Sequence, residues 1–182
     1  MPELGTGGRA LTAAERGTAT HLVLQHMDFS LGGSADGIRQ EIDRLCRAKF
    51  LSAREAEAVN VSAIEQLFRS PLGQRMLAAE HPLREFRFSL LLDAEPLYPG
   101  AAGEELLLQG VVDCCLQESD GLVIIDYKTD RVRTGEEISS RAALYRGQLR
   151  AYAAALQRIL GRPVKECVLY FLSAGKAVQM EI

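Results

Sequence analysis

The sequence predicts an α/β domain in which a central mixed β-sheet is flanked by helices, with a helical segment at the N-terminal end. The first half has helix-capping patterns and apolar residues at helical spacing, whereas the second half has short runs of apolar and β-branched residues between turn signals. A long segment rich in alanine and leucine separates two groups of these runs. The 182 residues are enough for one compact domain, so residues 1–182 are expected to fold as a single unit.

The N-terminal half has three helix-initiation patterns. Thr12-Ala-Ala-Glu15 fits a capping box, which predicts a helix running to about residue 28. Ser52-Ala-Arg-Glu55 is a second box, followed by helical sequence through Phe68. Ser70-Pro71 pairs an N-cap residue with proline at the first position of a short helix that ends near residue 79. A loop and an amphipathic helix are expected in between, with the loop at Gly32, Gly33 and Gly37 and the apolar stripe at Ile38, Ile42 and Leu45.

The second half changes to the pattern of strands. A Pro/Gly-rich loop separates the first two runs, and the long helix over residues 137–160 is ended by Gly161, with Pro163 two residues on. The last two runs flank Ser173-Ala-Gly-Lys176 and are expected to form a hairpin. The expected strands are residues 84–92, 106–117, 122–128, 167–172 and 177–182.

Composition limits the class of protein. The chain is 25% charged and 47% apolar, which is the balance of a folded domain rather than a disordered one. No apolar run approaches the roughly 20 residues that span a bilayer. The N-terminal segment lacks the layout of a secretory signal, so a cytoplasmic protein is expected, with residues 1–12 flexible. The four cysteines lack metal-ligand spacing, which argues against a zinc or iron–sulfur site and favours buried, reduced thiols.

Charge is distributed unevenly along the chain. The formal net charge of −3 does not by itself indicate a nucleic-acid-binding protein. A basic stretch beside an acidic site suits a phosphodiester substrate, but it is equally compatible with a solvated helix face. The arginines of this stretch are Arg131, Arg133, Arg141, Arg146 and Arg150, against Glu136 and Glu137.

Three charged residues are expected to converge in the hairpin that turns at residues 118–121. Directly opposed residues of antiparallel strands share a face, and that face repeats every second residue. A four-residue loop sets Asp113 opposite Asp126, whereas a two-residue turn sets Asp113 opposite Lys128. Both registers place the three side chains on one face, although a three-residue loop would separate them.

These charges lie among apolar strand residues and require an explanation. Two close carboxylates raise each other's pKa unless a cation neutralises them, and partly buried oxygen ligands are those that Mg²⁺ and Mn²⁺ use. Asp113 and Asp126 are therefore predicted to hold a metal, with Lys128 positioning water or stabilising charge on phosphorus. The alternative is a structural ion cluster. Buried ion pairs rarely improve stability over apolar residues, which favours the catalytic interpretation.

The chain contains three motifs in this order: Gly110-x-x-Asp113, Asp126-Tyr127-Lys128-Thr129 and Gln148-x-x-x-Tyr152. Together they resemble the motifs of PD-(D/E)XK nucleases of the RecB type. More narrowly, the chain is similar to the C-terminal nuclease domain of AddA-type helicase–nuclease subunits. The similarity extends upstream to residues 16–21 and 84–88 and so covers nearly the whole chain. It implies a restriction-endonuclease-like core in one nuclease domain that is a fragment of a larger helicase–nuclease chain.

The resemblance implies a metal site and a catalytic lysine. His21, Asp113 and Asp126 match the metal ligands of the family, the backbone carbonyl of Tyr127 matches a further one, and Lys128 matches the catalytic lysine. Aspartate at position 126 departs from the glutamate of many PD-(D/E)XK enzymes but is usual in the RecB branch. From the residues alone, a lone helical histidine such as His21 is more often structural.

Three further residues are singled out by the resemblance. Gln148 and Tyr152 match the RecB-type helix motif associated with the active site and DNA, and at i, i+4 they share one helix face. Without the resemblance, a core tyrosine and a surface glutamine would explain this pair as well. Glu85 matches a recurrent acidic position with no assigned role.

The resemblance implies a Mg²⁺-dependent deoxyribonuclease, for which Mn²⁺ substitutes. Its activity would be exonucleolytic on single-stranded DNA, on the strand ending 3′, in double-strand-break repair and recombination. The implied partners are DNA, an AddB-type partner subunit, and the helicase portion of the same polypeptide. The chain has no GxxxxGK[ST] phosphate loop and so is not the motor itself. The competing hypothesis is a catalytically inactive nuclease-like module for DNA binding or assembly, against which the intact Asp113, Asp126 and Lys128 argue.

Overall fold

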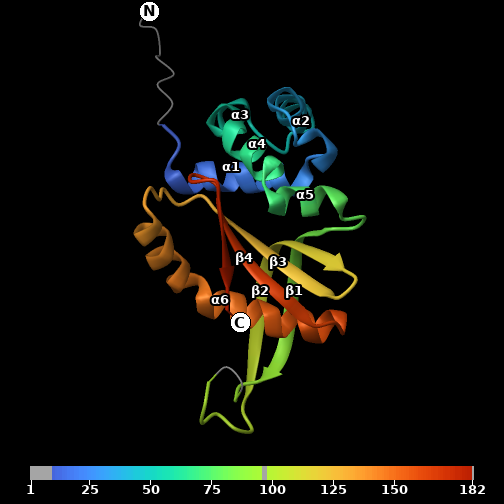
Figure 1. Cartoon of the computed structure of the whole chain (residues 1–182), viewed down its shortest axis with the longest axis vertical. Helices are drawn as coiled ribbons and strands as arrows, with labels where there is room; N and C mark the ends of the chain where they lie inside the picture. The colour runs from blue at the N-terminus through green and yellow to red at the C-terminus, as the bar shows by residue number, and fades with distance from the viewer. Residues whose placement is uncertain (1–9, 96–97, 182) are drawn as a thin grey trace, which may run out of the picture.

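The computed structural model describes residues 10–95 and 98–181. In these residues a five-stranded mixed sheet is covered by the N-terminal helices on one face and by one long helix on the other, and β1 and β2 extend beyond the other strands (Figure 1). This arrangement confirms the predicted α/β class with its N-terminal helical segment. The prediction that residues 1–12 are flexible falls mostly outside the described residues.

The N-terminal helical segment begins where the sequence places its caps. Thr12 and Ser52 each form the predicted capping box, with Glu15 and Glu55 respectively, and Ser70 caps the helix that has proline at its first position. None of the helices in the described part of the chain is long and apolar enough to cross a membrane. The elements are α1 (Ala13–His26), the 3-10 helix η1 (Phe29–Leu31), α2 (Ala35–Arg47), α3 (Ala53–Ala58), α4 (Val61–Arg69) and α5 (Pro71–Ala78).

Two predictions about this segment were wrong. Gly37 lies in the first turn of α2 rather than in a loop, because the Ser34 side chain caps the helix by accepting from the Gly37 N–H. A Cβ at Gly37 would collide with the carbonyl oxygen of Leu31, so the glycine serves close approach rather than flexibility. The single helix expected from residue 52 through residue 68 is two helices, because the Asn60 side chain caps α4 separately.

The sheet has the order β1-β2-β3-β4-β5. The first three strands pair antiparallel in chain order: β1 (Leu83–Asp93), β2 (Glu105–Glu118) and β3 (Gly121–Lys128). Strand β4 (Val164–Phe171) pairs parallel with β3, and β5 (Lys176–Met180) pairs antiparallel with β4. The connection from β3 to β4 contains α6 (Gly135–Leu160). This helix begins two residues before the predicted start because Thr134 forms a capping box, and Gly161 ends it with a φ of 64°, in the left-handed region.

The β2–β3 hairpin has the register that sets Asp113 opposite Asp126. The ladder that establishes it runs back from the turn to Cys114 opposite Ile125. The other register, with Asp113 opposite Lys128, is therefore wrong. The strand ends that carry the predicted site lie side by side at the edge where this ladder stops.

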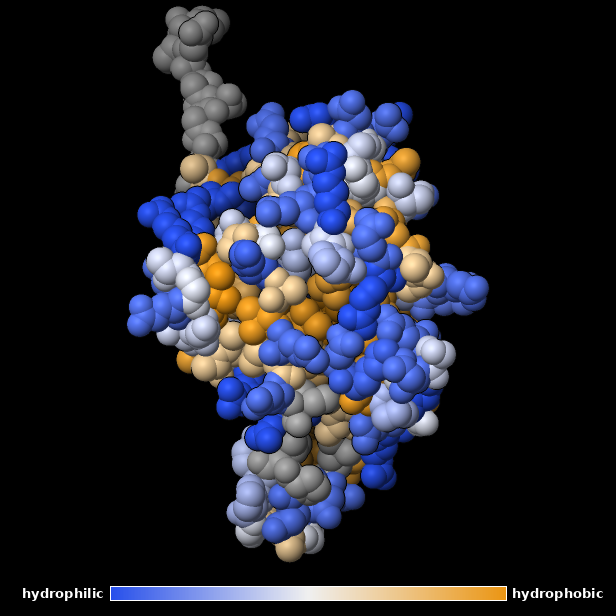
Figure 2. All heavy atoms as spheres, in the orientation of Figure 1, coloured by the Kyte–Doolittle hydropathy of each residue, from blue (hydrophilic) through white to orange (hydrophobic). Residues whose placement is uncertain are grey.

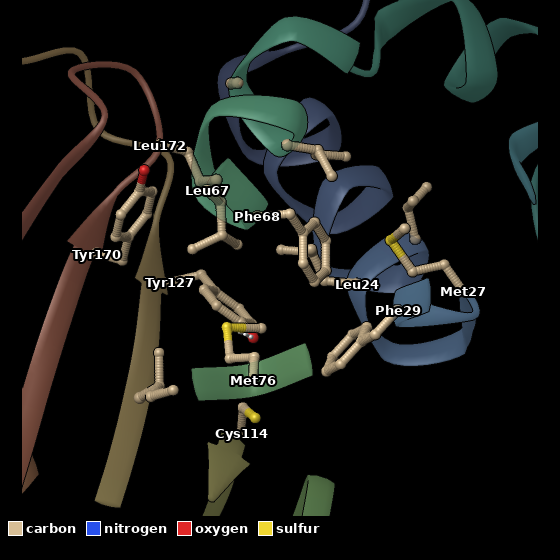
Figure 3. Packing of buried hydrophobic residues seen from close by; sticks show 14 of the residues in the cluster. Leu24, Met27, Phe29, Leu67, Phe68, Met76, Cys114, Tyr127, Tyr170 and Leu172 are labelled. Carbon is tan, nitrogen blue, oxygen red and sulfur yellow. Dashed lines mark hydrogen bonds between the residues drawn. The ribbon is translucent and has the colours of Figure 1, made fainter. Parts of the chain in front are cut away.

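Two hydrophobic clusters fill the molecule, one on each face of the sheet. The first lies between the N-terminal helices and the sheet, where Tyr127 of β3 points toward Met76 and Phe68 (Figure 3). The second lies under α6 on the opposite face. Figure 2 shows hydrophilic residues over most of the viewed surface, with a band of hydrophobic residues across the middle. Because strand residues alternate, Asp126 and Lys128 lie on the α6 side when Tyr127 faces the N-terminal helices.

Candidate metal centre

The candidate ligands gather where the pleat of β1 and β2 is interrupted. Arg84 pairs with Cys114 and Phe86 pairs with Val112, and between these pairs Glu85 has a φ of 48°, which non-glycine residues seldom adopt. Val112 and Cys114 belong to clusters on opposite faces of the sheet, although residues two apart in a regular strand share a face. Backbone strain of this kind concentrates at functional sites.

Three side chains from three elements meet at this interruption: His21 from α1, Glu85 from β1 and Asp113 from β2. One ligand atom from each lies within 4.8 Å of the others. Nδ1 of His21 is 3.3 Å from Oδ1 of Asp113 and 4.0 Å from Oε1 of Glu85. Their side chains are 29%, 12% and 19% exposed in the order His21, Asp113, Glu85, so the group is partly buried yet open to solvent.

Two of these groups, Glu85 and His21, have raised pKa values. Burial raises the pKa of Glu85, and the negative charge of Asp113 adds to that rise. Burial alone would lower the pKa of His21, but the hydrogen bond and the charge of Asp113 outweigh it and the pKa of His21 is raised. Both rises reflect negative charge concentrated in a partly buried space. A bound cation would neutralise that charge.

Asp113 is also hydrogen-bonded to β3. Its Oδ2 accepts from the backbone N–H of Tyr127 at 2.7 Å. In a strand, the N–H and C=O of one residue point to the same side and those of the next residue point to the other. The Lys128 carbonyl accepts from Leu172 on the β4 side, so the Tyr127 carbonyl is directed to the β2 side, where Asp113 lies. This direction is compatible with the role expected for the Tyr127 carbonyl.

Asp126 and Lys128 form a pair beside this group rather than within it. Nζ of Lys128 lies 2.5 Å from Oδ2 of Asp126, and the two side chains are 13% and 5% exposed respectively. The pair is electrostatic, because the buried Oδ2 has no partner with hydrogen-bond geometry in the described part of the chain. Burial and the charge of Asp113 raise the pKa of Asp126, against the opposing effect of Lys128. This buried oxygen is a candidate ligand for a cation, although the Lys128 ammonium already lies against it.

Tyr145 holds the Lys128 ammonium from the α6 side. Nζ lies 3.7 Å from the centre of the Tyr145 ring, which is a cation–π contact. The Tyr145 hydroxyl donates to Oδ2 of Asp130 at 3.1 Å, and Oδ1 of Asp130 is 3.6 Å from Nε of Arg141. Sequence reasoning did not identify Tyr145. The sequence signal that pointed to Tyr145 was its position three residues before Gln148, which places both side chains on the same face of one helix.

Gln148 and Tyr152 lie against the sheet and bond to each other. Nε2 of Gln148 donates to the Tyr152 hydroxyl at 2.8 Å. The Tyr152 ring packs edge-on against Phe88, with 5.5 Å between ring centres, and covers Gly110, where a Cβ would lie 2.7 Å from Cε1 of the ring. The glycine of the Gly110-x-x-Asp113 motif therefore allows α6 to approach β2. The α6 residue that reaches the lysine is Tyr145, one turn earlier.

The donor set fits a divalent cation. Carboxylate oxygens suit Mg²⁺ and Mn²⁺, and an imidazole extends the range to other transition metals. Of the predicted ligands, the structure brings His21 and Asp113 together and adds Glu85 to them, whereas it leaves Asp126 in the adjoining pair with Lys128. Glu85 and Asp126 are thus the two acids positioned to complete a site built on His21 and Asp113.

Known proteins resemble this chain over nearly its whole length. The family described as the PD-(D/E)XK nuclease superfamily matches residues 2–181. An ATP-dependent helicase/nuclease subunit from Alkaliphilus metalliredigens is 42% identical over 181 residues, which are 98% of this chain and 15% of that protein. The proteins of the same name from Moorella thermoacetica and Bacillus mycoides are 43% and 38% identical over 173 and 182 residues, covering 92% and 95% of this chain. The chain spans only 12–15% of the length of these three relatives.

Proposed function

Because the chain belongs to the PD-(D/E)XK nuclease superfamily, we propose that it hydrolyses DNA phosphodiester bonds with a divalent cation, Mg²⁺ in the first place, held at His21 and Asp113. One observation carries this proposal. A partly buried imidazole and two carboxylates from three separate elements converge beside a buried carboxylate–ammonium pair, Asp126 and Lys128. Buried charged groups seldom improve stability over apolar packing, which disfavours a purely structural cluster.

Each residue has a defined part in the proposed reaction. His21, Asp113 and the Tyr127 carbonyl would hold the cation, with Glu85 or Asp126 completing the set. When bound, such an ion supplies Lewis acidity and lowers the pKa of a coordinated water. The Lys128 ammonium donates hydrogen bonds to the attacking water or to a phosphoryl oxygen and stabilises the negative charge that develops on phosphorus.

The aromatic contact beneath Lys128 fixes where that ammonium lies. Tyr145 holds Nζ by its ring face and is itself oriented by Asp130, so the lysine is not free to swing into solvent. Over the next two turns of α6, Gln148 and Tyr152 offer an amide and a phenol, groups that hydrogen-bond to phosphate oxygens or base edges. We assign this pair to DNA contact rather than to bond cleavage.

The similarity to helicase/nuclease subunits suggests the context of the reaction. We propose that the chain is the nuclease domain of a larger helicase–nuclease subunit in the cytoplasm, working with an AddB-type partner in double-strand-break repair. Its substrate would be the single strand that ends 3′, degraded exonucleolytically. The net charge of −3 suits such a domain, because a motor portion of the same polypeptide would supply most of the grip on DNA.

The test is cleavage of a single-stranded oligonucleotide labelled at either end, with Mg²⁺ and with EDTA. We expect cleavage with Mg²⁺, none with EDTA, and at most about a hundredth of the wild-type rate for Lys128→Ala with Mg²⁺. The order in which products shorten from each labelled end reports polarity. Cleavage that persists in EDTA, or that is unchanged in Asp113→Ala, contradicts the proposal. DNA binding without cleavage by the wild-type chain would favour the inactive binding module.

A further inference from the structure

A groove of about 680 Å³ opens beside the metal centre, between the N-terminal end of α1 and the segment that follows β3. Figure 1 shows that segment passing close to α1 on its way to α6. The groove starts one residue beyond Lys128, because Thr129, Asp130 and Arg131 form part of its wall. Of these wall residues, the proposed function uses only Asp130, which orients Tyr145.

The groove and the metal centre share α1. Gly17 lines the groove and lies one helical turn before His21, on the same face of the helix. A Cβ at Gly17 would lie 2.8 Å from Oγ1 of Thr129, so the glycine lets α1 approach the segment after β3. A strand that leaves the site between His21 and Lys128 would therefore enter the groove directly.

The groove is basic although the chain as a whole is acidic. Three arginines line it, Arg16, Arg131 and Arg141, against one acid, Asp130. Arg131 is exposed and makes no ion pair with any residue in the described part of the chain, and Arg141 is 52% exposed at 3.6 Å from Asp130. Arg16 donates to the Leu11 carbonyl and helps to fix the wall.

The rest of the lining is suited to a sugar–phosphate backbone. Hydroxyl groups of threonine and serine line the groove, and its other residues are alanine, glycine, asparagine and leucine, with no aromatic ring. Base recognition on single strands depends on stacking against aromatic side chains, whereas arginine and hydroxyl groups bind phosphate in any sequence. A ligand here would be held by its phosphates.

We propose that this groove binds the phosphodiester backbone of single-stranded DNA on one side of the scissile phosphate, through Arg131 and Arg141. The inference rests on the proposed nuclease function and deepens it by naming where the strand runs. It also makes the binding independent of base sequence, because the contacts are to phosphates.

The test is binding of a fluorescent single-stranded oligothymidine in EDTA, where no cleavage is expected, by anisotropy at several salt concentrations. Arg131→Gln and Arg141→Gln should each weaken binding by roughly fivefold and flatten the salt dependence by about 0.7 in slope, one phosphate contact each. Arg131→Lys should restore most of the affinity because it keeps the charge. The matched control is Arg158→Gln, an exposed arginine near the other end of α6, which should bind as the wild type does.

The same variants are then assayed for cleavage in Mg²⁺, where the arginine losses should raise KM and leave kcat nearly unchanged. If the wild-type chain cleaves but Arg131→Gln and Arg141→Gln bind as it does, the groove inference fails and the nuclease proposal stands. If Arg158→Gln weakens binding equally, the effect is one of overall charge and the groove inference fails too. A wild-type chain that neither binds nor cleaves would overturn both proposals.

Discussion

The backbone N–H of Tyr127 donates to Oδ2 of Asp113 at 2.7 Å, so that a side chain takes the place of a main-chain partner where the β2–β3 ladder ends. The remaining oxygen of Asp113 faces Nδ1 of His21. One carboxylate thus joins two strands with one oxygen and offers the other to the candidate metal site. Its two functions are separable by substitution.

Replacing Asp113 by asparagine and by alanine separates them. Asp113→Asn keeps an oxygen that accepts from the Tyr127 N–H but removes the charge that attracts a cation. We expect both variants to bind Mn²⁺ at least about tenfold more weakly by calorimetry. Only Asp113→Ala should also lose about 1–3 kcal/mol of unfolding free energy in urea, because it leaves a backbone N–H unpaired. Wild-type Mn²⁺ affinity in Asp113→Asn would contradict the ligand assignment.

Removing the ammonium of Lys128 should stop cleavage and spare the metal. Lys128→Ala is expected to lower the cleavage rate by about a hundredfold or more, because the stabilisation of transition-state charge is lost. Mn²⁺ affinity by calorimetry should change little. The control is Lys176→Ala, an exposed lysine on β5, which should keep both properties. A Lys128→Ala variant that cleaves at the wild-type rate would remove the catalytic role of this lysine.

Tyr145 should act through Lys128 and by its ring rather than its hydroxyl. Tyr145→Phe keeps the ring 3.7 Å from Nζ and loses only the bond to Asp130, so kcat should stay within about threefold of wild type. Tyr145→Leu loses the cation–π contact, and kcat should fall about tenfold. Mn²⁺ affinity should be unchanged in both. Equal activity of the phenylalanine and leucine variants would show that the ring does not position the lysine.

The fourth ligand is decided between Asp126 and Glu85. We expect Asp126→Ala to lose both cleavage and Mn²⁺ binding, because its Oδ2 is buried without a hydrogen-bond partner in the described residues. Glu85→Gln should weaken Mn²⁺ binding about tenfold, since Glu85 lies in the group with His21 and Asp113. Calorimetric titration of the two variants side by side makes the comparison. Intact Mn²⁺ binding in Asp126→Ala would assign the ligand position to Glu85.

An ion-pair network away from the site predicts a dependence of stability on pH. The Arg75 guanidinium forms ion pairs with two glutamates: its Nε lies 2.9 Å from Oε1 of Glu118, and its Nη1 lies 2.8 Å from Oε2 of Glu166. The hydrogen bond from Arg75 holds the pKa of Glu118 below its usual range, and Lys165 lowers that pKa further. A depressed carboxyl pKa stabilises the fold above the unfolded value of 4.5, and that stabilisation is lost as pH falls through the lower folded value.

Arg75→Met should therefore cost about 1 kcal/mol of unfolding free energy near neutral pH, allowing for solvent screening of a partly exposed network. The difference from wild type should be smaller at an acidic pH, where the Glu118 carboxylate becomes protonated, than at neutral pH. Urea unfolding at the two pH values measures it. A difference that stays constant with pH would assign the loss to apolar contacts of the Arg75 side chain instead.

Much of the fold could be predicted because its signals are local. The capping boxes at Thr12 and Ser52 and the exit at Gly161 are read from residues three or four apart, and all three lie where expected. The missed break at Asn60 had a local signal too, since asparagine is a preferred N-cap residue. Gly37 was wrongly assigned to a loop. The position requires glycine because the Leu31 backbone approaches it closely, and no local sequence pattern reveals that approach.

The candidate site was predictable only in part. The placement of Asp113 beside β3 follows from hairpin counting, which needs nothing beyond the strand pattern. The approach of Glu85 depends on the pairing of β1 with β2 and on a positive φ in mid-strand, neither of which has a signal in the sequence. Regular alternation of side chains along the strands also predicts one shared face for Asp113, Asp126 and Lys128. In the structure the pleat of β2 is interrupted at Asp113. Asp113 therefore lies in the group with His21 and Glu85, and Asp126 lies in the neighbouring pair with Lys128.

A crystal of the chain soaked in Mn²⁺ tests most directly whether a divalent cation is held where α1, β1 and β2 meet. We predict one anomalous peak within coordination distance of His21 and Asp113, with Glu85 or Asp126 as a further oxygen ligand. No peak at this place, or a peak bound only by surface acids elsewhere on the molecule, would contradict it.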